Sequence, residues 1–464
     1  MEEWVMELLE SERSKRGVPL EAKSLNGNYY LYRSTTKYDR KSKKSRKVSE
    51  YIGRMTPSGV VERSVKQRSV YEYGNSALIR SLTGDLMNKL KKHFPDSWND
   101  IYALAVTRLL DPVPMRSVKE RWDKLYMSRD MDAHISPDSL SHILRDMGMN
   151  QDAQDSLFAD LMIESRKLAF DLSSIFSRSE TVNLSARGHN HEHMYLKQIN
   201  MALIFDMEHY MPVCLRPVEG SVKDVKALRN TLEIMNFHGI LVMDRGFTSH
   251  DLSEIMDKRM KFLMPLRRNQ EEADYNMHLG STFMYRNRGI LCGFSSVESH
   301  RIYMFYDPLL AGEEASTFIS LISNGKRNQS QYDMESCKFG KIAVLSNIND
   351  DPEQIYLMYK QREEIEQAFD AMKNEMENDR SYLRDDESLR GYFFISFLSL
   401  YMYYTIFVLI RAADLTSKYS VKDVLLRFSR VYRITGERKE YNSEVPASVE
   451  NLDKKLGTNL FPKN

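Results

Sequence analysis

Cysteine is scarce in this sequence. Its 464 residues include three cysteines, Cys214, Cys292 and Cys337, which are too few and too scattered for a disulfide framework or a zinc module. The opening residues, 1–10, are acidic and lack the basic segment that begins a signal peptide. We therefore expect the protein to work in a reducing, cytoplasmic environment.

Net charge is almost absent as well, at +1 for the whole chain, and such a balance alone says nothing about nucleic acid. The distribution says more, because residues 33–68 carry twelve Lys and Arg against three acidic residues. Within this segment, residues 37–47 form a basic hairpin tip between two aromatic strands predicted at 27–36 and 47–53. This pattern favours contact with DNA phosphates over a solvated loop, through Lys41, Lys43, Lys44 and Arg46.

The next region, residues 76–165, has mainly helical periodicity. Residues 98–110 predict one helix, which ends before Pro112. Residues 136–148 predict another, with a serine cap, a first-turn proline and a terminal glycine. A helix-turn-helix that binds DNA and a plain helical linker are both compatible with this pattern.

Two apolar strands that follow each carry one aspartate. Asp171 interrupts the run at 168–176, and Asp244 ends the run at 239–244. Burying a carboxylate without a partner is costly, so two such strands in one domain suggest a shared cation. The predicted order of three strands, a helix, a strand, a helix and a strand indicates an α/β domain with a ribonuclease H-like core.

Residues 351–373 predict one continuous helix, and four polar residues share one side of it. Tyr359, Arg362, Glu366 and Lys373 fall within about 60° of one another around the axis, over about 21 Å of its length. A salt-bridged surface helix is the plain alternative. The functional reading is a site that holds a metal ion beside a polyanionic backbone.

The spacing Tyr-x2-Arg-x3-Glu-x6-Lys resembles the signature helix of the DDE transposases of bacterial and archaeal insertion sequences. The run from Asp244 to Phe247, Asp-Arg-Gly-Phe, is similar to the second motif of that family. The resemblance implies that Asp171, Asp244 and Glu366 are catalytic and bind two Mg²⁺ or Mn²⁺ ions. It also implies that Tyr359, Arg362 and Lys373 hold DNA phosphates.

For the whole protein, the resemblance implies a transposase that cuts double-stranded DNA at the ends of its element and joins those ends to target DNA. A homodimer on the DNA ends, in the cytoplasm and associated with the nucleoid, is the expected state. The acids Asp244 and Glu366 are 122 residues apart, and this distance predicts a β-rich insertion between them. A transposase-derived DNA-binding protein without transposition activity is the alternative function.

The expected fold class is therefore α/β, with a ribonuclease H-like catalytic core and a β-rich insertion, preceded by a small basic β module and a helical region. The expected segments are the basic β module at 1–75, the helical region at 76–165, the core at 166–266 and 346–435, the insertion at 267–345, and a polar C-terminal tail at 436–464.

Two further segments allow more than one interpretation. Residues 391–410 carry no charge and are long enough to span a bilayer, but tyrosines and serines run through them, which favours a buried helix and no membrane. The segment begins with Gly391 and Tyr392 where the family often has Gly-His. His189 to His193 alternate three imidazoles, as in a metal site or, more plainly, a polar loop.

Overall fold

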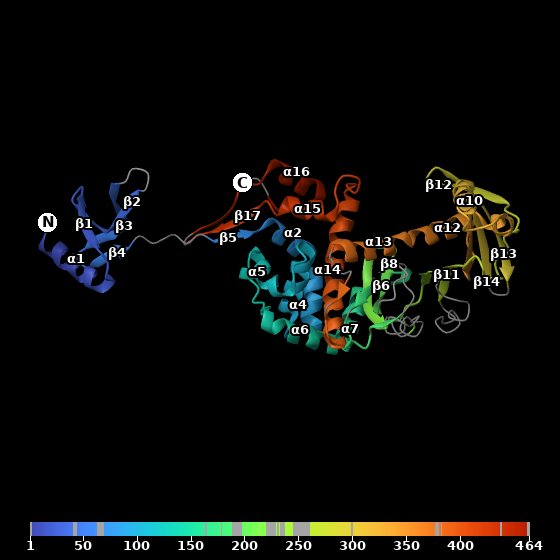
Figure 1. The fold of residues 1–464 in the computed structure, drawn as a ribbon, viewed down its shortest axis with the longest axis horizontal. Helices are drawn as coiled ribbons and strands as arrows, with labels where there is room; N and C mark the ends of the chain where they lie inside the picture. Colours follow the sequence, from blue (N-terminus) through green and yellow to red (C-terminus); the bar gives the residue numbers. More distant parts are fainter. Residues whose placement is uncertain are drawn as a thin grey trace. The chain divides into compact units, whose positions relative to one another are not determined.

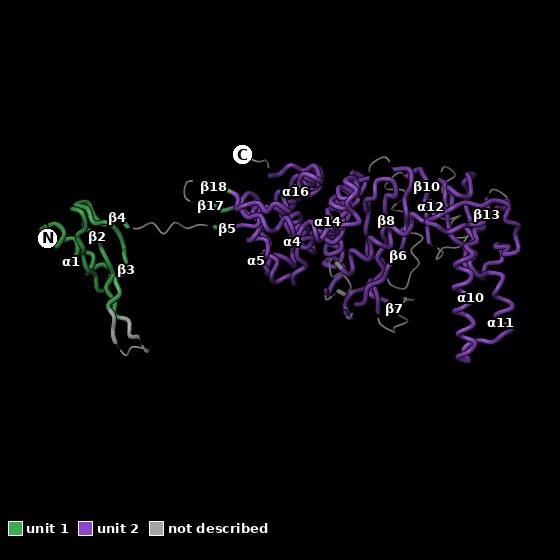
Figure 2. Tube along the Cα trace, turned by 90° about the horizontal axis from the view of Figure 1, so that it is seen from above, with its two compact units in different colours: residues 1–70, 434–441 green, residues 71–433, 442–464 purple. Residues whose placement is uncertain are grey.

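The computed structural model of the chain divides into two units, residues 1–70 with 434–441 and residues 71–433 with 442–464 (Figure 2). The residues it describes are 2–39, 44–62, 69–162, 165–177, 179–187, 197–219, 229, 232, 237–244, 260–297, 300–375, 380–381, 383–436 and 439–461.

The first unit is a four-stranded antiparallel sheet with one helix. Helix α1 (Glu3–Arg16) ends at Gly17, and the strands follow in order as β1 (Leu20–Leu25), β2 (Asn28–Asp39), β3 (Lys44–Thr56) and β4 (Gly59–Glu62). A small core of Val5, Leu9, Leu20, Leu31 and Met55 joins the helix to the sheet. Strands β2 and β3 are the two aromatic strands predicted from the sequence, whereas α1 was not predicted.

Helices dominate the first part of the second unit. They are α2 (Gly74–Leu82), α3 (Gly84–His93), α4 (Trp98–Leu110), α5 (Val118–Trp122), α6 (Pro137–Met149) and α7 (Gln151–Leu161). Both helices expected from the sequence are present as α4 and α6. The hydroxyl of Ser136 accepts a hydrogen bond from the Ser139 N–H at the start of α6, as an N-cap residue does.

A large mixed sheet forms the centre of this unit. Strands β6 (Lys167–Ser177), β10 (Ile240–Met243) and β11 (Lys261–Pro265) are parallel neighbours, while β8 (Lys197–Asp206) is antiparallel to both β6 and β9 (Met211–Glu219). This order, β9–β8–β6–β10–β11, is consistent with the ribonuclease H-like core expected from the sequence. A short strand β7 (Ala186–Arg187) also pairs with β8.

The strands of the predicted insertion extend the same sheet. They are β12 (Ser281–Tyr285), β13 (Arg288–Val297), β14 (His300–Tyr306) and β15 (Lys341–Ser346), and β15 pairs antiparallel with β11. Helices α10 (Pro308–Ser323) and α11 (Gln329–Glu335) lie between β14 and β15 along the chain. In Figure 1 these elements lie beyond β11, at the far end of the sheet from the helices α4 and α6.

The segment after β15 contains two helices where the sequence predicts one. Helix α12 (Pro352–Gln361) and helix α13 (Glu363–Asp370) are separated by one residue, Arg362. A π-helical turn (Ala371–Glu375) follows α13. At the junction, the Arg362 N–H bonds to the Tyr359 carbonyl oxygen at 3.2 Å. This bond spans three residues, so the helix tightens at the junction into a 3₁₀-like turn. The expectation of a continuous helix is corrected in this respect.

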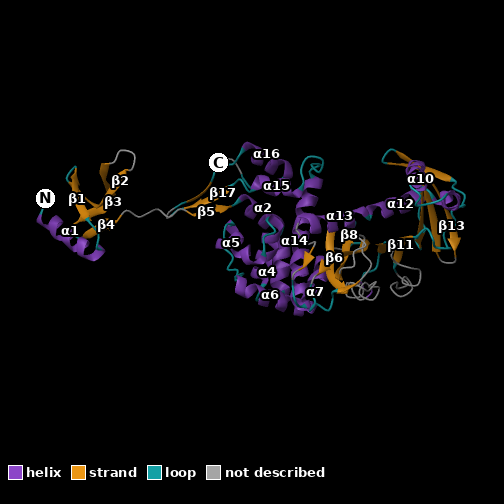
Figure 3. Cartoon of the chain, viewed as in Figure 1, coloured by secondary structure: helices purple, strands orange, loops and turns teal. Residues whose placement is uncertain are grey.

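The apolar run at 391–410 lies inside helix α14 (Asp386–Ala412), which packs against α6, α4 and β9. Among the described residues, it is the one helix long and apolar enough to cross a membrane, and 67% of its apolar window is buried. Figure 3 shows it between the helices α4 and α6 on one side and the strands β6 and β8 on the other. Burial in this core accounts for its composition, as the sequence predicts.

The C-terminal region is more structured than the polar tail expected from the sequence. After α15 (Val421–Phe428) and β17 (Tyr432–Thr435), which precede that tail, it contains β18 (Glu440–Asn442) and α16 (Ala447–Leu456). Strands β17 and β18 form a small sheet with β5 (Ser69–Glu72). The carboxylate of Asp453, itself buried, accepts hydrogen bonds from the N–H groups of Leu460 and Phe461, both at 3.1 Å. These bonds hold the last described residues against α16.

Candidate active site

The two predicted aspartates lie side by side on neighbouring strands. Asp171 is in the middle of β6, and Asp244 follows the last residue of β10. The two strands are parallel, with Met243 opposite Phe170, so the next pair in register is Asp244 and Asp171. Phe170 faces the core and is 1% exposed. Alternation along the strand therefore turns Asp171 to the other face of the sheet.

The third predicted acid comes from helix α13, which packs against β6. Ile365, Ala368 and Phe369 form the buried side of α13. The spacing of these residues leaves Glu366 on a different side of the helix, where its side chain is 52% exposed.

One arginine contacts all three acids. The Nη1 atom of Arg362 lies 3.5 Å from Oδ2 of Asp171 and 3.4 Å from Oδ1 of Asp244. Its Nη2 atom pairs with Oε1 of Glu366, one helical turn away. The three carboxylates therefore converge on a single guanidinium, although they come from β6, the end of β10 and α13.

This arrangement changes the protonation of the most buried acid. The pKa of Asp171 is raised to about 7, mainly because burial disfavours its charged form. The Arg362 charge and the Leu172 N–H, which donates to Oδ1 at 2.8 Å, lower that pKa in part, while the charges of Asp244 and Glu366 raise it further. At neutral pH, Asp171 is therefore partly protonated.

The same neighbours keep Arg362 charged. Its side chain is 14% exposed, and burial acts to lower its pKa, but the three acids raise it above the ordinary value for arginine. The site thus combines one permanent positive charge with three carboxylates, of which one titrates near neutrality.

Lys373 and Tyr359 are the other two residues of the predicted stripe. The Nζ atom of Lys373 donates a hydrogen bond to Oγ of Ser173 at 2.6 Å. Ser173 is two residues beyond Asp171 on β6, so it lies on the same face of the sheet. Tyr359 lies on α12, with its ring 6.4 Å from that of Tyr356. Lys373 is thus joined to β6 close to Asp171, whereas Tyr359 lies near the end of α12.

Sequence reasoning missed Ser173 and the contacts that hold α12 in place. Side chains two residues apart on a strand lie on the same face, so the position of Ser173 two residues after Asp171 could have pointed to it. Tyr356, which is buried, packs edge-on against Phe283 and Tyr285 of β12 at 5.3 and 5.2 Å. These rings dock the β12–β13 hairpin on the helix that precedes Arg362.

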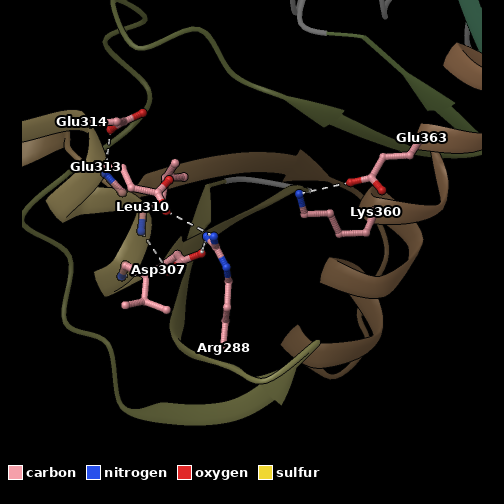
Figure 4. A network of polar contacts seen from close by, with 9 residues as sticks. Arg288, Asp307, Leu310, Glu313, Glu314, Lys360 and Glu363 are labelled. Atoms are coloured by element: carbon pink, nitrogen blue, oxygen red, sulfur yellow. Dashed lines mark hydrogen bonds and ion pairs between the residues drawn. The ribbon is translucent and has the colours of Figure 1, made fainter. Parts of the chain in front are cut away.

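Ion pairs also join this hairpin to neighbouring elements, as Figure 4 shows. Arg288 of β13 pairs with Asp307 at 2.9 Å and with Glu313 of α10 at 3.3 Å. In the same view, Nζ of Lys360 lies 3.4 Å from Oε1 of Glu363. Glu363 also pairs with Arg286 at the hairpin turn, at 3.4 Å. The insertion thereby contributes to fixing the helical junction that presents Arg362.

Several predicted residues lie outside the described part of the structure. They include Lys41 and Lys43 of the basic hairpin, the side chains of Lys44 and Arg46, and the histidines of residues 189–193. Residues 245–247 of the Asp-Arg-Gly-Phe run are outside it too. Their predicted roles stay predictions.

The acids have the right chemistry for a hard divalent cation, because Mg²⁺ and Mn²⁺ prefer carboxylate oxygens. Within the described ranges, no group of three or more histidine, cysteine or acidic residues is placed closely enough to hold a metal ion as it stands. The acids are instead gathered around the Arg362 guanidinium. The donor set therefore fits such an ion in type, while the Arg362 guanidinium lies at the point where the three carboxylates converge.

Comparison with known proteins gives one family. Residues 171–402, half of the chain, match the family model described as the transposase DDE domain. A search of curated proteins finds no match. Among solved structures, the chain is similar to the piggyBac transposase in a cryo-EM structure of its synaptic complex with hairpin DNA. That similarity has a TM-score of 0.44 and 12% identity, over 86% of this chain and 88% of the other.

Proposed function

We propose that this chain, which belongs to the family of transposase DDE domains, cuts DNA at the ends of an insertion sequence and joins those ends to target DNA. The observation that carries the proposal is the convergence of Asp171, Asp244 and Glu366 on the guanidinium of Arg362. A structural ion pair needs one acid for one arginine. Three acids from separate elements around one cation are better suited to a site that handles additional positive charge.

Asp171, Asp244 and Glu366 are the residues that would hold two Mg²⁺ or Mn²⁺ ions. When bound, such ions activate an attacking oxygen and stabilise the leaving oxygen of a phosphodiester. Asp171 pairs with Leu203 of β8, and the residue before it, Phe170, pairs with Met243 of β10, so the backbone at Asp171 is held within the sheet. A rigidly held carboxylate is what a precise phosphoryl-transfer site requires.

The chain itself would bind and orient the DNA. Arg362 is a charged donor among the acids, and its planar fork can grip a phosphate oxygen with two N–H groups. Lys373, placed on β6 through Ser173, would hold a neighbouring phosphate as a point charge. Tyr359 would add a phenol to the same row of contacts. Asp171, whose pKa is near 7 without a metal ion, would have to lose its proton to bind such an ion.

The proposed partners are double-stranded DNA, at both the element ends and the target, and a second copy of the chain bound to the paired ends. Lys41, Lys43, Lys44 and Arg46 would add phosphate contacts from the first unit. The expected location is the cytoplasm, in association with the nucleoid. Light scattering of the protein with and without end DNA tests the dimer, since a mass of two chains is expected with DNA.

The activity is tested with linear DNA that carries the ends of the element itself. Wild-type protein should cut at those ends in Mg²⁺ or Mn²⁺ and should not cut in EDTA. DNA of equal length without the ends is the matched control and should stay intact. Failure to cut the end-bearing DNA with either metal, by protein that binds it, would contradict the proposal and favour a DNA-binding protein without transposition activity.

A further inference from the structure

The four-stranded sheet of the first unit has two unlike faces. One face packs on helix α1 through Leu20, Leu31 and Met55. Because side chains alternate along a strand, the residues next to these turn to the other face. Within the described part of this unit, α1 is the one helix (Figure 1), and it lies on the apolar side.

Three tyrosines lie together on the face that α1 does not cover. Tyr30 and Tyr32 come from β2, and Tyr51 comes from the adjacent strand β3. The ring of Tyr51 is 6.0 Å from that of Tyr30 and 5.4 Å from that of Tyr32. All three rings are half-buried, so they form one cluster with Tyr51 at its centre.

Positive charges border this cluster. The Nζ atom of Lys23 lies 4.5 Å from the centre of the Tyr32 ring. Arg54 stands opposite Tyr30 in the pairing of β2 with β3. On the side towards the basic hairpin tip, Lys47 pairs with Glu21. Cations and rings thus share this surface with one acid, Glu21, which pairs with both Lys23 and Lys47.

We propose that this face binds single-stranded DNA, with bases stacked on the tyrosine rings and phosphates held by Lys23, Lys47 and Arg54. Charge complementarity favours a polyanion, since Lys23, Lys47 and Arg54 border the rings and the basic segment at residues 37–47 joins β2 to β3 in the sequence. Tyrosine rings can stack only on the flat faces of bases. In a duplex these faces are covered by neighbouring base pairs, whereas in a single strand they are exposed. The rings and cations suit any single-stranded nucleic acid, and the choice of DNA over RNA rests on the proposed function.

The first test is fluorescence anisotropy of the full chain with a labelled oligothymidylate of about 20 nucleotides, long enough for one or more such sites. A duplex of equal length is measured in parallel, each over a series of salt concentrations. The variants are Tyr51→Leu, which removes the ring, and Tyr51→Phe, which keeps it. Tyr432→Leu is the matched control, because Tyr432 is an exposed tyrosine of the second unit.

Tyr51→Leu should weaken binding of the single strand about tenfold, with little change on the duplex. Its dependence on salt should stay that of wild type, because every cation that holds a phosphate remains in this variant. Tyr51→Phe and Tyr432→Leu should bind as wild type. Trp4 packs against Tyr29 on the opposite face, with ring centres 5.7 Å apart, whereas Trp98 and Trp122 belong to the second unit. A change in tryptophan fluorescence relative to wild type therefore reports whether a variant of the first unit is folded.

Three results would overturn the proposal. The first is that folded Tyr51→Leu binds the single strand as tightly as wild type does. The second is that Tyr51→Phe loses as much affinity for the single strand as Tyr51→Leu does. The third is that Tyr51→Leu loses as much affinity for the duplex as for the single strand. Tighter binding of an oligouridylate than of the oligothymidylate would overturn the choice of DNA. Cleavage of end-bearing DNA is scored separately, so a wild-type protein that fails to cut leaves this outcome unaffected.

Discussion

The Nη1 nitrogen of Arg362 lies 3.5 Å from Oδ2 of Asp171, and the same nitrogen lies 3.4 Å from Oδ1 of Asp244. One guanidinium nitrogen is therefore shared by two carboxylates from adjacent parallel strands. Burial of Asp171 outweighs this attraction, since its pKa is still raised to about 7. The strands thus hold an acid in a place that disfavours its charge, which is a cost to stability that a functional role would explain.

Asp171→Asn should stabilise the protein at high pH. The folded-state pKa of about 7 exceeds the ordinary value of 3.8, so the folded chain holds a proton that the unfolded chain releases between these values. Stability therefore falls as pH rises from about 4 to about 7. The variant does not show this fall, and its gain at pH 8 is at most roughly 4 kcal/mol, at 1.4 kcal/mol per pKa unit, a difference that already includes the attraction of Asp171 to Arg362.

Urea unfolding of both proteins at pH 5 and pH 8 measures this difference, which should be larger at pH 8. Asp307→Asn is a control of opposite sign, because the pKa of Asp307 is lowered in the folded protein. That variant should lose stability at pH 8. A gain for Asp171→Asn that is the same at both pH values would contradict the assigned environment of Asp171.

Arg362→Ala should weaken binding of end DNA and also destabilise the protein. Its removal leaves three carboxylates without their shared cation, which costs about 2 kcal/mol or more for a mainly buried group. Arg362→Lys should recover only part of both losses, because an ammonium lacks the planar fork that reaches several oxygens at once. Gel shift and thermal unfolding on the same preparations give the two readouts. Full recovery by lysine would mean that charge alone matters here.

Gly391→Ala should destabilise the second unit by about 3 kcal/mol, in the range of severe overpacking. A Cβ at Gly391 of α14 would collide with the carbonyl oxygen of Leu144 of α6, and one at Gly148 of α6 would collide with that of Glu387 of α14. The two helices thus cross with their backbones in close approach. Gly312→Ala in α10 is the control, since a Cβ there meets nothing within 4 Å.

The control should stabilise its helix slightly, by about 0.5–1 kcal/mol. Chemical unfolding of the three proteins tests the pair of expectations. Equal effects at Gly391 and Gly312 would show that helix propensity, and not the crossing, decides the outcome.

Replacing Lys41, Lys43, Lys44 and Arg46 together with alanine should reduce DNA affinity and flatten its salt dependence. The slope of log K against log salt should fall by up to about four units, close to one for each phosphate that these cations neutralise. Titration of end-bearing duplex over several salt concentrations gives the slope. A slope equal to that of wild type would mean that the hairpin tip is only solvated.

Sequence patterns were informative where the signal is local. A lone aspartate in an apolar strand pointed to Asp171 and Asp244, and helical spacing pointed to Arg362 and Glu366. Short apolar runs predicted the strands β6, β8, β9, β10 and β11. Such features depend on neighbours within a few residues, so they can be seen without the fold.

Features set by distant contacts could not be predicted in this way. The junction at Arg362 depends on aromatic rings of β12 that pack on Tyr356. The bond between Lys373 and Ser173 joins residues far apart in the sequence. Helix α16 looked like a polar tail because its three buried apolar residues, Val449, Leu452 and Leu456, are spread among charges and are explained only by the core that receives them.

The central claim is that Asp171, Asp244 and Glu366 form one site for cutting DNA. The most direct measurement is cleavage of end-bearing DNA in Mg²⁺ by wild type, Asp171→Asn, Asp244→Asn and Glu366→Gln, with a gel shift on the same preparations. Each variant should lose cleavage by about a thousandfold or more and keep end binding, because removing a negative charge near DNA does not oppose binding. Near wild-type cutting by any one of the three would remove that acid from the site. Equal losses of binding and cutting in all three would mean that the acids form a structural ion-pair network.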